Sequence, residues 1–144
     1  MVLPVYKSKF KIGIKGLEST AEDMVNISQM ESFSVSIDNG IEEWNPMESN
    51  GWARKLITAK SLSISLNGKR DVGDVGNDYV ASLYFAIGSD ANTKFEWTMI
   101  DGTVVSFDCI VNVTAAGGDS TALDVLEFEV LSDGEPTVTP AAKD

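Results

Sequence analysis

A strict alternation of apolar and polar residues is the feature that most limits the fold of this chain. The segments 32–37 and 61–66 alternate one apolar residue with one serine, and the segments 95–99, 105–113 and 126–130 keep the same period. Successive side chains point to opposite faces of a β-strand, so each segment predicts a strand with one buried face. We therefore expect a mainly β fold, namely an antiparallel β-sandwich or half-open barrel.

Turn and helix signals complete this outline. Asp101-Gly102 separates two alternating segments and predicts a tight hairpin. One flanking α-helix is expected over residues 78–87, with Asn77 or Asp78 as its N-cap and Gly88 as its stop. Its apolar face would comprise Val80, Leu83, Tyr84 and Ile87.

Length and charge limit the domain organisation and the partners. The 144 residues suffice for a single domain, which we place at 1–134, followed by an extended C-terminal tail at 135–144. The net charge of −11 argues against binding nucleic acid through its phosphates, which requires clustered lysine and arginine. We expect no signal peptide and no membrane-spanning segment, because the chain has no apolar run of the necessary length.

Residues suited to catalysis are scarce. The chain has no histidine, which removes the commonest general base and metal ligand, and its single cysteine, Cys109, lies in an apolar run typical of a buried strand. Alternating acids such as Glu127 and Glu129 fit the solvated face of a strand better than a pair of catalytic carboxylates. A calcium loop at 71–78 is the weaker alternative to a turn and helix cap. We expect no enzyme activity, metal or cofactor.

The segment 39–56 has the composition of a long protruding loop, yet it carries large apolar side chains. Acidic residues dominate its first half and basic residues its end. Exposed tryptophans usually contact a partner surface, so we expect an interface at Trp44, Pro46, Met47, Trp52, Arg54 and Lys55. The alternative is a loop that folds back on its own domain.

The same region resembles a known family. The matching residues, in order, are Trp44, Pro46, Gly51-Trp52, Arg54, Leu56, Lys60, the strand SISL, Gly68-Lys69-Arg70 and a Gly-Asp-rich approach to a helix. This run is similar to that of the major tail tube protein of long-tailed, siphovirus-type phages, and the resemblance extends over most of the chain. It implies a hexameric ring whose inner strands form one barrel, with rings stacked head to tail into a tube.

The resemblance also implies partners and a location. They are further copies of the chain, a tape measure protein, a tail terminator and a distal tail protein, in a virion tail assembled in the host cytoplasm. DNA would pass through the tube without specific binding. An acidic lumen repels phosphates and lets DNA slide, and the candidates for its lining are Asp38, Glu96, Asp108, Glu127 and Glu129.

Two other functions remain open at this point. The inner tube of a contractile tail or bacteriocin would share the same fold. A monomeric β-sandwich that binds carbohydrate would use Trp44 and Trp52 to stack on sugar rings.

Overall fold

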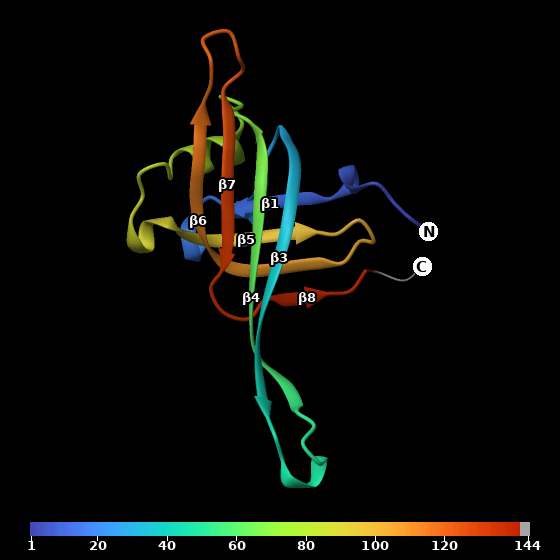
Figure 1. Cartoon of the computed structure of the whole chain (residues 1–144). Helices are drawn as coiled ribbons and strands as arrows, with labels where there is room; N and C mark the ends of the chain where they lie inside the picture. The colour runs from blue at the N-terminus through green and yellow to red at the C-terminus, as the bar shows by residue number, and fades with distance from the viewer. Residues whose placement is uncertain (142–144) are drawn as a thin grey trace.

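The structure, a computed structural model, describes residues 1–141, so the last three residues of the predicted tail 135–144 lie outside the described residues. All of its strands belong to one antiparallel sheet with the order β2-β1-β5-β6-β7-β4-β3, and β8 pairs with β6 (Figure 1). The strands are β1 (Lys9–Gly13), β2 (Met24–Asn26), β3 (Met30–Trp44), β4 (Arg54–Lys69), β5 (Asn92–Thr98), β6 (Val104–Gly117), β7 (Val125–Ser132) and β8 (Thr137–Thr139). The helix α1 spans Val75–Ala81, and short 3-10 helices lie at Val5–Lys7, Gly16–Glu18, Ala21–Asp23, Met47–Ser49 and Gly88–Ala91.

Strand β6 belongs to both layers of the fold. Its first half pairs with β5, from Val104 to Ile110, and its second half pairs with β7, from Cys109 to Gly117. Between the two, β6 bends, so that β1 and β5 cross behind β7, β4 and β3 (Figure 1). The sheet thus folds over on itself as a half-open barrel, which confirms the predicted mainly β class with a flanking helix.

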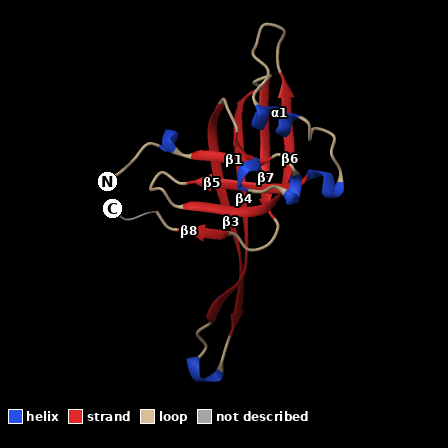
Figure 2. Ribbon diagram, turned by 180° about the vertical axis from the view of Figure 1, so that it is seen from behind, coloured by secondary structure: helices blue, strands red, loops and turns tan. Residues whose placement is uncertain are grey.

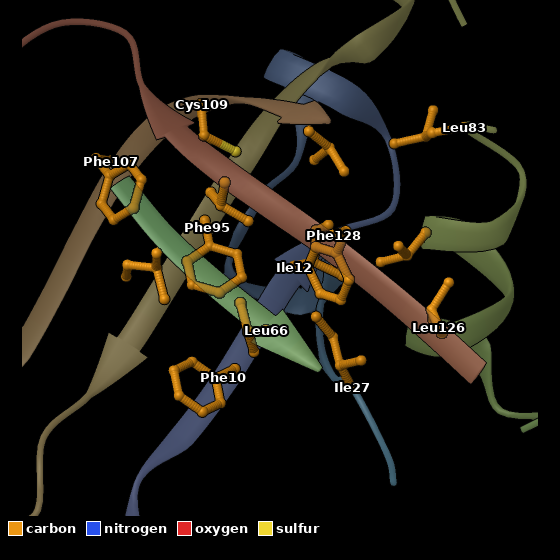
Figure 3. Close-up of a cluster of buried hydrophobic side chains, with 14 of the residues drawn as sticks. Phe10, Ile12, Ile27, Leu66, Leu83, Phe95, Phe107, Cys109, Leu126 and Phe128 are labelled. Carbon is orange, nitrogen blue, oxygen red and sulfur yellow. The ribbon is translucent and has the colours of Figure 1, made fainter. Parts of the chain in front are cut away.

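The alternation read from the sequence becomes a continuous core between the two layers. Phe95 and Leu66 are fully buried and come from opposite layers, and Phe10 and Phe107 pack beside Phe95 (Figure 3). The ring centroids of Phe95 lie 6.1 Å from Phe10 and 5.7 Å from Phe107. Phe10 also meets Phe33 of β3 edge to face at 4.9 Å, which joins the first strand of one layer to the last strand of the other.

The predicted helix is shifted and shorter than expected. It begins at Val75, because the side chain of Asp74 accepts a hydrogen bond from the backbone N–H of Asn77 and caps it, and it ends at Ala81. Val80 and Leu83 are buried as predicted, but the prediction for Ile87 was wrong, since its side chain is exposed. The described part of the chain contains no helix with the length and hydrophobicity needed to cross a bilayer.

Asn77 is buried instead of capping the helix. Its side-chain oxygen accepts hydrogen bonds from Arg70 Nη1 at 2.9 Å and from the Asp71 backbone N–H at 3.0 Å. Its amide nitrogen donates to the backbone oxygens of Lys69 and Ser28. One side chain therefore connects the end of β4, the helix and the segment that leads into β3.

We expect Asn77→Ala to lower the free energy of unfolding by about 2–3 kcal/mol, because it leaves several partly buried groups without a partner. Urea unfolding at low protein concentration measures the change. Ser89→Ala, on the exposed surface of the 3-10 helix Gly88–Ala91, is the control and should leave stability unchanged. Equal stabilities for the two variants would contradict the role assigned to Asn77.

Candidate assembly surfaces

The segment predicted as a long protruding loop is a protruding β-hairpin. Strand β3 continues to Trp44 and β4 begins at Arg54, so residues 45–53 alone connect the two strands. Gly40 faces Ala59 across the ribbon, next to a register shift between Gly40 and Ile41. These small side chains let the two strands approach and twist tightly. The hairpin leaves the body of the molecule as a separate arm (Figures 1 and 2).

The predicted interface residues gather at the end of this arm. Met47 is 99% exposed and Trp52 80% exposed, so the tip does not fold back on its own domain. The guanidinium carbon of Arg54 lies 5.9 Å from the centroid of the Trp44 ring, and Lys55 Nζ lies 4.0 Å from Glu43 Oε2. The Arg54 contact holds Trp44 against the ribbon, whereas Trp52 and Met47 project as apolar groups.

The ribbon carries an additional apolar face that the sequence analysis missed. Ile37, Ile41 and Ile57 continue the face of β3 and β4 that is buried in the body, but on the arm all three are exposed. The signal was present, because the apolar alternation of 33–37 resumes at Ile41. An apolar face without a covering layer indicates a contact surface.

Within residues 1–141, the layer β3-β4-β7-β6 has an unpaired strand edge on each side. Strand β3 pairs only with β4 along its whole length. Strand β6 has β7 on one side, but its other side loses its partner after Ile110, so residues 111–117 form a second free edge. The layer β3-β4-β7-β6 thus presents backbone N–H and C=O groups at both sides, which is a template for pairing with another chain.

The five predicted lumen acids lie on one face of the sheet, but the fold divides them between two outer surfaces. Glu127 and Glu129 stand on the outer face of the β3-β4-β7-β6 layer, and Asp38 lies on the same face where the arm begins. That face is otherwise rich in serine, and Ser65 Oγ donates to Glu129 Oε2 at 3.4 Å.

Glu96 and Asp108 lie in the other layer, beside lysines. In the register of the sheet, Lys11 faces Glu96 and Lys94 faces Asp108. Opposite charges at such cross-strand positions attract and partly neutralise each other. The acidic surface of the β3-β4-β7-β6 layer is therefore made by Glu127, Glu129 and Asp38, without Glu96 and Asp108.

The groups considered for chemistry have structural roles. Burial raises the pKa of the Cys109 thiol to about 12, so it stays protonated and unreactive at neutral pH. A hydrogen bond from Arg70 lowers the pKa of Asp78, and Asp71 accepts a hydrogen bond from Ser28 Oγ at 2.6 Å. Within residues 1–141, no three acidic or cysteine side chains are grouped as a metal site.

Comparison with solved structures shows which assemblies share this fold. A chain in the tail of an empty gene transfer agent particle, refined with helical and C6 symmetry, matches with a TM-score of 0.78 at 16% identity, over 96% of this chain and 100% of that chain. A chain in the virion of a native gene transfer agent particle matches with a TM-score of 0.75 at 15% identity, over 96% and 100% of the two chains.

A chain in the sheath-tube complex of an extracellular contractile injection system in its extended state matches with a TM-score of 0.60 at 13% identity, over 96% of this chain and 91% of that chain. At such identities the likeness establishes a shared fold. No protein-family model and no curated protein matches the chain by sequence.

We expect Trp52→Ala to change the free energy of unfolding of the isolated subunit by less than about 0.5 kcal/mol, because the indole is exposed. Phe95→Ala, which leaves a cavity in the core, should lower the free energy of unfolding by about 3–5 kcal/mol and serves as the contrast. Thermal or urea unfolding distinguishes them. A loss for Trp52→Ala as large as that for Phe95→Ala would place Trp52 in the core.

Proposed function

We propose that this chain is the structural subunit of a virion tail tube, in which copies join side by side into rings and the rings stack into a hollow conduit for DNA. The observation that carries the proposal is the pair of free edges on the β3-β4-β7-β6 layer. The shared fold with chains of a gene transfer agent tail supports it. The family resemblance of residues 44–70 also supports the proposal.

Ring closure follows from the direction of the strands. Each strand of the layer is antiparallel to its neighbour, so β6 also runs opposite to β3. The β3 edge of one copy can therefore pair with residues 111–117 of β6 in the next copy and continue the antiparallel alternation. Repetition around an axis gives one closed barrel in which these edges are satisfied. The C6 symmetry of the gene transfer agent tail supports six copies per ring.

Stacking is assigned to the protruding hairpin. The arm extends along the direction of β3 and β4, which is the direction from one ring to the next if these strands line the barrel (Figure 1). Trp52 and Met47 at its tip are the anchors, with Trp44, Pro46, Arg54 and Lys55 around them. Such a head-to-tail contact adds rings without limit until another protein caps the tube.

The lumen is assigned to the serine-rich outer face of the same layer. Glu127, Glu129 and Asp38 would give this surface its negative charge, which keeps the phosphate backbone from adhering. The face opposite to it packs on the core, so this outer face is available to line the barrel. Glu96 and Asp108 are assigned to the outer surface of the other layer, beside Lys11 and Lys94.

The family resemblance extends the proposal to partners and location. It implies a tape measure protein inside the tube, a terminator and a distal tail protein at its ends, and assembly in the host cytoplasm. A non-contractile, siphovirus-type tail is favoured over the inner tube of a contractile system. The reason is the family resemblance of residues 44–70, while the fold shared with a chain of a contractile injection system keeps the inner tube as the second candidate.

We expect the purified chain to form rings or tubes in negative-stain electron micrographs and to elute as a large species in size exclusion. Trp52→Ala should shift tubes towards single rings, because loss of a central aromatic anchor typically costs about 2 kcal/mol or more per contact. Ser49→Ala changes the same tip without removing an anchor and should leave tubes intact. A monomer at high concentration for the unmodified chain would overturn the proposal.

We expect lysine substitutions at Glu127 and Glu129 to slow DNA passage in tubes that still assemble, because a basic lumen binds phosphates. The matched control is lysine at Glu96 and Asp108, which lie on the other layer. DNA delivery by reconstituted particles is the measurement. Equal delivery by both double variants would count against an electrostatic role for the lumen.

A further inference from the structure

An apolar pocket opens at the flank of the molecule where the arm leaves the body. Its volume is about 630 Å³, and it lies between the root of the arm and the ends of β5, β6 and β8. Apolar side chains dominate its walls: Ile37, Leu62, Trp97, Met99, Val105 and Val138. Ile37 and Val138 are each 57% exposed. The pocket exists because β3 pairs only with β4 and does not close the barrel over β5.

The wall of the pocket also contains an incomplete hydrogen bond. Trp97 Nε1 is buried and has no acceptor among the described residues. A buried donor without an acceptor lowers the stability of the free subunit.

The opposite flank carries an apolar projection. The segment 82–91 forms the outermost loop on the side of β6, and the pocket elements lie on the side of β3 and the termini (Figures 1 and 2). Phe85 is 92% exposed and Ile87 is 85% exposed. Ala86, between them, packs against the core and fixes the loop so that its two large neighbours point outward. Two projecting apolar groups on a short anchored loop can insert into a pocket of another chain, and we call Phe85 and Ile87 together the plug.

We infer that Phe85 and Ile87 of one copy occupy the pocket of the adjacent copy in the ring. The inference rests on the proposed function, since pairing of the β3 edge with the β6 edge of the next copy brings these two flanks together. The loop 82–91 lies on the β6 side of the molecule, and β8, whose Val138 lines the pocket, lies on the β3 side (Figure 1). The exposed side chains of Lys60 and Glu135 both line the pocket, so their charges cancel and the contact depends on the apolar walls.

This contact gives the ring a second lateral bond of a different chemistry. The strand edges supply backbone hydrogen bonds, which are indifferent to sequence, whereas the plug and the pocket supply shape and apolar complementarity. The two halves of the contact lie on opposite flanks of one chain, so the contact is heterologous and closes only as a ring.

The test is cross-linking between two cysteine variants, one substituted in the loop and one in the pocket. Ile87→Cys is mixed with Val138→Cys and treated with a short bis-maleimide, which joins thiols of different copies. The buried thiol of Cys109, with its raised pKa, should not react. We expect about tenfold more linked dimer than from the control mixture of Ile87→Cys with Leu123→Cys, because the ring raises the effective concentration of neighbouring thiols. Leu123 is exposed in the turn after β6, away from the pocket.

Micrographs of the same mixtures separate the two ideas. Rings that form without a preferred link between positions 87 and 138 would overturn the inference and leave the proposed function standing. Absence of rings from the unmodified chain would overturn the proposed function and, with it, the inference. A second pair of variants adds a check: Phe85→Ser should reduce the ring fraction strongly while the melting temperature of the subunit stays constant, and Leu123→Ser should change neither.

Discussion

The backbone hydrogen bonds that the sheet leaves unused are the constraint on which the rest of this structure depends. The layer β3-β4-β7-β6 ends in a long free strand on one side and in the unpaired half of β6 on the other. Exposed edges of this length invite uncontrolled pairing unless they are covered or matched to a specific partner. The two edges run in opposite directions, so the β3 edge of one copy can pair with the β6 edge of another copy.

The bend of β6 couples this open layer to a stable core. Its first half belongs to the layer that holds β1 and β5, and its second half provides the free edge. The aromatic cluster of Phe10, Phe95 and Phe107 fills the space between the layers. A subunit can therefore remain folded alone while one of its layers is incomplete, which is a requirement for a protein that is made first and assembled later.

The alternation of neighbouring side chains predicted the strands, but it could not predict contacts between segments that are distant in sequence. The alternation at 32–37, 61–66 and 105–113 identifies strands because side-chain direction depends only on neighbouring residues. The role of Asn77 depends in part on a remote segment, because the backbone oxygen of Ser28 accepts one of its hydrogen bonds, and within residues 1–141 no segment covers Ile87. The pairing of Lys11 with Glu96 is equally non-local, so the predicted acidic set could not be divided correctly from the sequence.

The pairing of Gly40 with Ala59 has a consequence for the mechanics of a long filament. At this point the arm is narrow, because Gly40 has no side chain and Ala59 contributes only a methyl group. When a stack of rings bends, the deformation would therefore occur mainly at Gly40 and Ala59 of each arm, while the barrel walls keep their shape. A tail built from these subunits would bend at the arms that join one ring to the next. The rings themselves would keep their shape, so the bore would stay open.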